Sequence, residues 1–299
     1  MLDYRLRHPD IAEDEWTILS RDPDKFIKRH PKLAAQPGVR FCQGDVRTFA
    51  IGGERYDVVI HAATDAVTTL SDDEMTSVIV DGTRHVIGAA KICGAKKLML
   101  TSSGAVYGAC SAAVSEDSDC KPTTAYGKGK LLAEQMCCAS GLHVLLPRCF
   151  AFVGPYLNRS IHFAIGNFIQ NCLDGQPIVI KGDGSPMRSY LYADDLVEWL
   201  FAILDRGQSC RPYNVGSPDA ISIKDLAYLV RDTLQSNNLK SNNQTIINQT
   251  ISRIQVLGQS VSGASNVYVP NIDRVANELG LGVKTCLSDA VRMSSKPSS

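Results

Sequence analysis

A tyrosine and a lysine four residues apart, Tyr126 and Lys130, have the types and spacing needed for proton-transfer chemistry. In a helix this spacing puts both side chains on one face. A phenol has a pKa of about 10 and is a poor base, but a neighbouring ammonium favours the phenolate, which can accept a proton from an alcohol. The spacing is also common by chance, and the alternative is an ordinary surface pair on an amphipathic helix.

Three consecutive hydroxyl residues, Thr101 to Ser103, follow the apolar run 97–100. In an open parallel sheet, ligands bind at the carboxyl ends of the strands. A Ser103 hydroxyl at such an end can hydrogen-bond the same substrate oxygen as Tyr126. These residues therefore predict a site that holds a substrate hydroxyl.

Apolar runs typical of buried strands alternate with helical patterns in the first half of the chain. The expected strands cover 17–20, 39–42, 56–63, 97–101 and 143–146, and the expected helices cover 22–36, 72–93 and 125–139. This alternation predicts right-handed βαβ units around a parallel sheet. In the second half we expect helices over 161–173, 193–204, 223–234 and 272–279, a strand over 178–180, a surface loop over 236–250 and a frayed tail over 294–299.

Two further strand ends, Gly44-Asp45-Val46 and His61-Ala62-Ala63, fall on the same predicted sheet edge. Small residues such as Ala62 and Ala63 let a dinucleotide lie close to the backbone. The Asp45 carboxylate is suited to accept a hydrogen bond from an adenine amino group.

Composition excludes several classes of protein. The 299 residues carry 31 basic and 31 acidic side chains, whereas nucleic-acid and anionic-membrane binders show a basic excess. No apolar run is long enough to span a bilayer, and no secretory signal opens the chain. The ten cysteines are scattered without a zinc-type pair of closely spaced cysteines, which favours reduced core thiols in a cytoplasmic protein that has no metal site.

Taken together and in order, the motifs resemble those of an extended short-chain dehydrogenase/reductase of the nucleotide-sugar epimerase/dehydratase group. The resemblance rests on Gly44-Asp45-Val46, His61-Ala62-Ala63, Tyr126-xxx-Lys130 and the segments 102–108, 147–155, 188–194, 213–217 and 273–280. It implies an α/β fold with a Rossmann-type doubly wound parallel sheet in residues 1–150 and a smaller C-terminal α/β substrate domain in 151–299. Segments near 188–204 and 213–217 are expected to return to the first domain.

The resemblance also implies roles for the reacting residues. Tyr126 would take a proton from a sugar hydroxyl, Lys130 would lower the pKa of Tyr126 and hold the nicotinamide ribose, and Ser103 would orient the hydroxyl. A hydride would pass from the sugar ring, usually from C4, to NAD or NADP. The residues expected at the cofactor are Ser20, Arg21, Asp45, Val46, His61, Ala62, Ala63, Thr101 and Cys149.

The remaining implied roles concern the substrate and the assembly. Arg188 would grip the diphosphate of a nucleotide sugar, the alternative being a surface arginine paired with Asp194 or Asp195. Phe163 and Ile180 would flank the nucleotide base. Two long helices, over 72–93 and 125–139, would pair two copies into a homodimer.

The start of the sequence departs from the family pattern. This fold opens with a strand, a glycine-rich phosphate loop and a helix, but here no glycine precedes Gly38, so the first strand and the loop are expected to be missing. Loss of that strand would leave the edges of its neighbours unpaired. Ser20-Arg21 stands where NAD enzymes usually have an acidic residue, so NADP is an alternative cofactor.

A second departure bears on the reaction. The 4,6-dehydratases of the family carry Thr-Asp-Glu where this chain has Ser103-Gly104-Ala105, and related decarboxylases usually keep the glutamate. This disfavours elimination and favours an epimerase. Two alternatives stay open: an NADP-dependent reductase of a keto-sugar or another carbonyl compound, and a non-catalytic, truncated family member.

Overall fold

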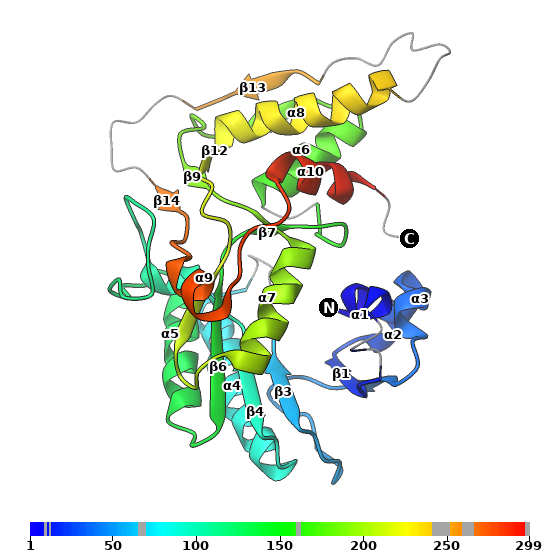
Figure 1. The fold of residues 1–299 in the computed structure, drawn as a ribbon, viewed down its shortest axis with the longest axis vertical. Helices are drawn as coiled ribbons and strands as arrows, with labels where there is room; N and C mark the ends of the chain where they lie inside the picture. Colours follow the sequence, from blue (N-terminus) through cyan, green and yellow to red (C-terminus); the bar gives the residue numbers. More distant parts are fainter. Residues whose placement is uncertain are drawn as a thin grey trace.

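The computed structural model describes residues 1–8, 11, 13–64, 70–159, 163–240, 252–258 and 266–296, with side chains not described for 236–240. The main sheet contains β3 (Val58–His61), β4 (Lys97–Leu100), β6 (His143–Cys149) and β11 (Pro212–Val215), in the order β11-β6-β4-β3 (Figure 1). A short strand, β5 (Ser102–Ser103), also pairs with β6, and every pairing in this sheet is parallel. The predicted α/β fold with a parallel sheet is confirmed.

Helices cover both faces of this sheet because its strands are apolar on both faces. Leu98, Leu100 and Val144 pack in one core against α4 (Asp72–Ile92) and α5 (Ala125–Cys138). Met99 and Leu145, one residue out of phase, pack in another core against α7 (Ala193–Arg206). This alternation is the doubly wound arrangement that the sequence predicts.

Side-chain caps fix the starts of the two helices on the first face. Ser71 accepts a hydrogen bond from the Glu74 amide at the start of α4, and Thr124 accepts one from the Gly127 amide at the start of α5. The second cap sets the position of Tyr126 in the first turn of α5.

The second half of the chain builds a separate core. Apart from α7 and β11, the elements of this half of the chain are β7 (Phe152–Val153), α6 (Ala164–Leu173), β8 (Ile178–Ile180), β9 (Met187–Arg188), β10 (Leu191–Tyr192), β12 (Ile221–Ser222), α8 (Ile223–Lys240), β13 (Ile254–Val256), β14 (Val267–Tyr268), α9 (Asp273–Leu279) and α10 (Leu287–Ser295). Residues of α6, α8, α10 and β8 share that core. However, β11 of this half pairs with β6 of the main sheet, so the two halves of the chain are interleaved. The domain boundary near residue 150 therefore stays a prediction.

The first strands stand apart from the main sheet. A parallel pair, β1 (Trp16–Ser20) and β2 (Val39–Gln43), forms its own two-stranded sheet beside α1 (Leu2–Arg7), α2 (Pro23–Arg29) and α3 (Pro31–Ala34) (Figure 1). Within the described ranges, no strand pairs with the outer edge of β3 or with the free edge of β1. The sequence predicted unpaired edges of this kind.

Three expectations need correction. The predicted helix over 22–36 is divided at Pro31, because a proline lacks the amide that would continue the helix. The predicted loop over 236–250 begins inside α8, which extends to Lys240, and its remainder lies outside the described residues. The predicted tail is ordered into α10 as far as Ser295, where Ser294 is buried and donates to the Ala290 carbonyl.

All ten cysteines are free thiols. Cys93 and Cys137 are buried as expected, but Cys42, Cys210 and Cys286 are exposed, so the thiols are not all core residues. No helix of the described segments is both long and apolar enough to cross a membrane.

Candidate active site

The predicted reacting side chains converge where β5 meets the first turn of α5. Ser103 is buried, ends β5 and caps the short 3-10 helix η2 (Gly104–Tyr107) by accepting a hydrogen bond from the Ala105 amide at 3.2 Å. Its side chain also lies close enough to Tyr126 to lower the pKa of that phenol. The Lys130 ammonium lies 5.8 Å from the centre of the Tyr126 ring. The three residues that the sequence predicted to share a site therefore lie close together, and their catalytic roles stay predictions.

Lys130 joins α5 to the carboxyl ends of two strands. Its Nζ donates to the Thr101 carbonyl at 2.9 Å and to the Thr64 hydroxyl at 2.8 Å. The Thr64 hydroxyl in turn donates to the Ala63 carbonyl at 2.8 Å. Burial lowers the pKa of Lys130 to about 8, so its charge titrates close to neutral pH.

The pKa of Tyr126 does not shift in the predicted direction. Burial raises the pKa of Tyr126, the adjacent Ser103 hydroxyl lowers it, and the neighbouring Cys149 raises it. Lys130 does not produce the lowering that the sequence suggested, because its ammonium is directed at Thr64 and Thr101. Ser103 is therefore the side chain that favours the phenolate in this geometry.

A buried ion pair lies behind the site. The Arg148 guanidinium in β6 donates to both carboxylate oxygens of Glu134 in α5, at 3.0 and 2.7 Å, and both side chains are almost fully buried. Arg148 also donates to the Tyr107 hydroxyl at 3.0 Å, and Ser102 donates to Glu134. The pair therefore ties α5 to β5, β6 and η2, the elements that position Ser103 and Tyr126.

The expected cofactor residues at the end of β3 differ in exposure. His61 is buried, while Ala62 and Ala63 are exposed. Burial lowers the pKa of His61 to about 4, which keeps the ring neutral. The Thr83 hydroxyl donates to the Ile79 carbonyl and therefore accepts from Nε2–H of His61, at 3.1 Å. His61 is a packing residue that fixes the strand end, and the two alanines are open to a ligand.

The residues expected near the adenosine lie on the separate β1–β2 sheet and just after it. Ser20 ends β1, and its hydroxyl accepts a hydrogen bond from the Asp22 amide. Asp45 is paired with Arg47 through bonds of 2.9 Å, and this pair, with a smaller effect of Arg21, lowers the pKa of Asp45 to about 2. Val46 packs toward α4, where it contacts Gly82.

Cys149 is at the end of β6, close to Lys130 and Tyr126. Burial raises the pKa of the Cys149 thiol to about 12, so the group is protonated at neutral pH. A protonated thiol is a poor nucleophile, which favours a packing role for Cys149 over a reacting one.

The three expected substrate residues have different surroundings. The Arg188 guanidinium donates to the carbonyls of Met187 and Asn266 and to the Asn266 side chain. The alternative of a pair with Asp194 or Asp195 is wrong, because Asp194 pairs with Arg7 at 2.7 Å and Asp195 accepts from Lys284 and Thr285.

Ile180 does not present its side chain to a ligand. It is 3% exposed and packs in the core of the second half, while Val179 before it is 37% exposed. The expectation named the wrong face, because side chains in a strand alternate between faces. Phe163 is the N-cap residue of α6 and is 38% exposed.

Sequence analysis missed a second tyrosine at the site. Tyr268 in β14 is half-buried, and its hydroxyl lies 3.4 Å from Oγ of Ser103. Burial raises the pKa of Tyr268 above its usual range, so it stays protonated. No local pattern marks this residue, because it reaches Ser103 across 165 positions of sequence.

Comparisons with known proteins show the family to which the chain belongs. A model of the NAD dependent epimerase/dehydratase family matches residues 7–216, and the chain belongs to that family. UDP-glucuronic acid decarboxylase 1 of Xenopus tropicalis is 32% identical over 167 residues, which are 52% of this chain and 39% of the relative. UDP-N-acetyl-alpha-D-glucosaminuronate decarboxylase of Bacillus cytotoxicus is 31% identical over 197 residues, which are 62% of this chain and 61% of the relative.

A solved structure extends the likeness to the whole fold. UDP-glucuronic acid 4-epimerase from Bacillus cereus, in complex with NAD, has a TM-score of 0.79 at 20% identity and covers 98% of this chain and 93% of that one. At this identity the likeness shows the fold alone. The two decarboxylases are matched over less than two thirds of their length.

Proposed function

We propose that the chain is a nucleotide-sugar epimerase that works by transient oxidation of a sugar hydroxyl at C4. The observation that carries this proposal is the convergence of Ser103, Tyr126 and Lys130 at the carboxyl ends of adjacent parallel strands. A phenol, a hydroxyl and an ammonium together can hold an alcohol and remove its proton.

Each of the three side chains has one task. Tyr126 takes the proton of the C4 hydroxyl and returns it when the ketone is reduced. Ser103 hydrogen-bonds the same oxygen and favours the phenolate of Tyr126 by lowering its pKa. Lys130 holds the strand ends through its hydrogen bonds to Thr64 and Thr101. Among the described residues, these bonds use two of the three N–H donors of the ammonium, which leaves one for a ribose hydroxyl.

The residues fit NAD or NADP at both ends of the dinucleotide. Ala62, Ala63 and Thr101 offer an open strand edge next to Lys130, and Ser20 with Arg21 offers a polar end at β1. Bound there, NAD or NADP would supply the hydride acceptor for oxidation at C4 and the hydride donor for the reduction that follows. The pyrophosphate has no glycine loop among the described residues of this chain.

Steric contacts around η2 favour an epimerase over a dehydratase. A Cβ atom on Gly104 would lie 2.6 Å from the Phe150 ring, so a carboxylate side chain does not fit at this position. Ala105 carries no acid or base. Water elimination needs a proton donor and a base beside the substrate, whereas epimerisation needs only the three residues above and the nicotinamide cofactor.

The substrate class and assembly complete the proposal. A UDP- or dTDP-type nucleotide sugar would place its diphosphate near Arg188 and its base near Phe163. We expect a cytoplasmic homodimer formed by α4 and α5, whose outer residues Ile92 and Leu132 are 70% and 42% exposed. Light scattering that gives the monomer mass would remove this expectation.

The test is calorimetric titration with NAD⁺ and NADP⁺, followed by conversion assays with nucleotide sugars. We expect binding of one cofactor and interconversion of C4 epimers, with a loss of at least a hundredfold in kcat for Tyr126→Phe, the size of a general-base contribution. A Phe variant as active as the wild type would refute the role of Tyr126.

A second candidate is an NADP-dependent reductase of a keto-sugar. The feature that favours it is Ser20-Arg21 at the end of β1, which suits a 2′-phosphate. A reductase consumes NADPH in proportion to product, whereas an epimerase leaves the cofactor unchanged overall. Failure to bind either cofactor would favour the third alternative, a non-catalytic member of the family.

A further inference from the structure

Two cysteines from distant parts of the sequence meet at the start of β6. Cys138 is the last residue of α5, and Cys210 lies in the turn between α7 and β11. Both are joined to Val144 of β6. The Cys210 amide donates to the Val144 carbonyl at 2.7 Å, and Cys138 packs in the same hydrophobic core as Val144. The start of β6 therefore brings the end of α5 and this turn together.

The two thiols are close enough to act on each other. Burial and the nearby Cys210 raise the pKa of the Cys138 thiol to about 12. Cys210 also affects the pKa of Cys137, but Cys137 is fully buried, whereas Cys138 is half-buried and Cys210 is exposed. A reagent in solvent therefore reaches Cys210 first and meets Cys138 beside it.

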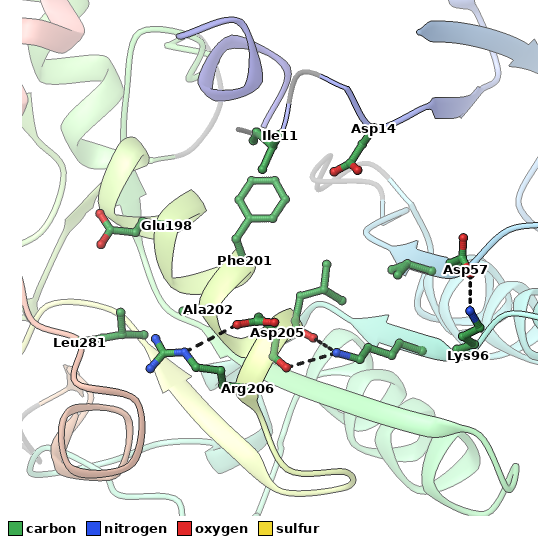
Figure 2. A pocket seen from close by; sticks show the side chains of 13 residues that line it. Ile11, Asp14, Asp57, Lys96, Glu198, Phe201, Ala202, Asp205, Arg206 and Leu281 are labelled. Atoms are coloured by element: carbon green, nitrogen blue, oxygen red, sulfur yellow. Dashed lines mark hydrogen bonds and ion pairs between the residues drawn. The ribbon is translucent and has the colours of Figure 1, made fainter. Parts of the chain in front are cut away.

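Hydrogen bonds to two strands hold the turn that carries the exposed thiol. Where α7 leads into the turn, Lys97 of β4 donates to the carbonyls of Leu204 and Asp205 at 2.7 and 3.2 Å, at the wall of a cavity of about 660 Å³ (Figure 2). Within the turn, the Val144 amide donates to the Ser209 hydroxyl at 3.0 Å. These bonds fix the turn relative to the main sheet, on which α5 also packs.

The backbone of Cys210 has a conformation that favours glycine. Its φ is 57°, and in the part of the chain that the structure describes it is the only residue other than glycine with a positive φ. A Cβ atom makes this left-handed conformation unfavourable, so it persists only where surrounding contacts impose it. Positions of this kind cluster at functional sites, and here the strained residue carries an exposed thiol.

We propose that Cys138 and Cys210 form a reversible modification site, at which a low-molecular-weight disulfide of the glutathione type oxidises the two thiols to an intramolecular disulfide. The Cys210 thiolate attacks one sulfur of glutathione disulfide and releases one glutathione thiolate. Cys138 then loses its proton to water and attacks the Cys210 sulfur, which releases the second glutathione. The two protein thiols lose two electrons and two protons in total, and the reagent gains them as two glutathione thiols.

The disulfide ties the last residue of α5 to the turn before β11. Tyr126 and Lys130 lie in the first half of the same helix, and Glu134 joins its middle to β6. The bond therefore adds a covalent link at the end of α5 that is opposite the candidate active site. Neither cofactor nor sugar takes part in forming it, so this proposal and the proposed function fail independently.

The test maps the bond in the folded full chain. The reduced protein is incubated with glutathione disulfide at a concentration that modifies the exposed Cys42 and Cys286, and the remaining thiols are blocked with N-ethylmaleimide. Mass spectrometry of the unreduced tryptic digest should show the peptides 131–148 and 207–224 joined by a disulfide, and dithiothreitol should separate them.

Unfolding provides the first control. In urea that unfolds the chain, the yield of this pair of peptides should fall at least tenfold, because the fold no longer selects two thiols among the ten cysteines. An equal yield in the folded and the unfolded chain would overturn the proposal. Absence of the pair from the folded wild type, while Cys42 and Cys286 carry glutathione, would overturn it as well.

Matched variants assign the bond, because peptide 131–148 contains two adjacent cysteines. Cys138→Ala should abolish the link and leave Cys210 bound to one glutathione, whereas Cys137→Ala should keep the link. The opposite result would overturn the proposal, by showing that the buried neighbour is the partner.

Cys210→Gly removes the exposed thiol and suits the positive φ at this position. This variant should therefore fold at least as stably as the wild type and yet form no link, and a link between peptide 131–148 and another cysteine in it would overturn the proposal. Thermal unfolding in the absence of the reagent checks that each variant folds.

Discussion

At the scale of single residues, His61 links burial to the pH dependence of stability. Its pKa is about 4 in the folded chain and about 6.5 when unfolded, because burial disfavours the charged ring. Between these values only the unfolded state binds the proton, so acid favours unfolding. Stability should fall by up to about 3 kcal/mol as pH drops from about 6.5 to about 4.

Urea unfolding of the wild type and of His61→Asn at several pH values measures this effect. The variant should be less stable at pH 7, since it loses the packing and the Thr83 contact of the ring. It should nevertheless lose less stability on acidification. If the stability of the two proteins fell equally with pH, the loss of stability on acidification could not be assigned to His61.

Tyr268 provides a second prediction at this scale, which rests on the proposed function. Its hydroxyl lies 3.4 Å from Ser103 and remains protonated, so it can donate to a sugar oxygen beside the Tyr126 phenol. Tyr268→Phe should lower kcat/KM about tenfold, the value of one lost hydrogen bond in the transition state. An unchanged rate with nucleotide sugar would show that Tyr268 only packs against Phe150.

Among the elements, the attachment of α5 to the main sheet depends on the ion pair between Glu134 and Arg148. Both side chains are almost fully buried, and the pair connects α5 to β6. Removing one partner leaves a buried charge without compensation, so Glu134→Leu or Arg148→Met should each cost about 3–5 kcal/mol. The double variant should recover much of that loss, because no charge then remains buried.

A double-mutant cycle in urea measures this coupling. Additive losses, with the double variant less stable than either single variant, would contradict the view that the ion pair acts as a unit. Because the pair lies behind the site, the double variant also tests whether α5 keeps Tyr126 in place when packing replaces charge.

The sequence specified most elements because their patterns are local. Buried strands such as β4 show as continuous apolar runs, and α4 shows as a capped amphipathic helix. Pro31 was visible, yet its effect on the helix was underestimated. The element α10 was missed because its nine residues are short and polar in part, and only packing against the core of the second half stabilises it.

The candidate site, like the elements, was predictable from the sequence where local patterns place its residues. Tyr126, Lys130 and Ser103 could be found because a helix start and a strand end place them. Ile180 was assigned to the wrong face, since a strand of three residues shows too little alternation to fix its orientation. Tyr268 and Thr64 act through contacts between distant segments, which no pattern in a single sequence records.

At the scale of the whole molecule, the β1–β2 sheet shares no backbone ladder with the main sheet within the described residues. The β1–β2 sheet is joined to the rest by side chains: the rings of Trp16 and Tyr4 lie 6.1 and 5.9 Å from Phe201, and Arg7 pairs with Asp194. Exposed ion pairs contribute about 1 kcal/mol or less, so the contacts of Phe201 carry most of this connection.

We therefore predict that the β1–β2 sheet opens before the main sheet unfolds. Segments with few buried contacts open at a lower free energy than the core, so amides of β1 should exchange at least tenfold faster than those of the fully buried β4. Hydrogen exchange followed by mass spectrometry measures both strands in one experiment. Phe201→Ala should accelerate exchange in β1 further and leave β4 almost unchanged. Equal exchange rates in the two strands would show instead that the side chains of α7 couple both sheets into one cooperative unit.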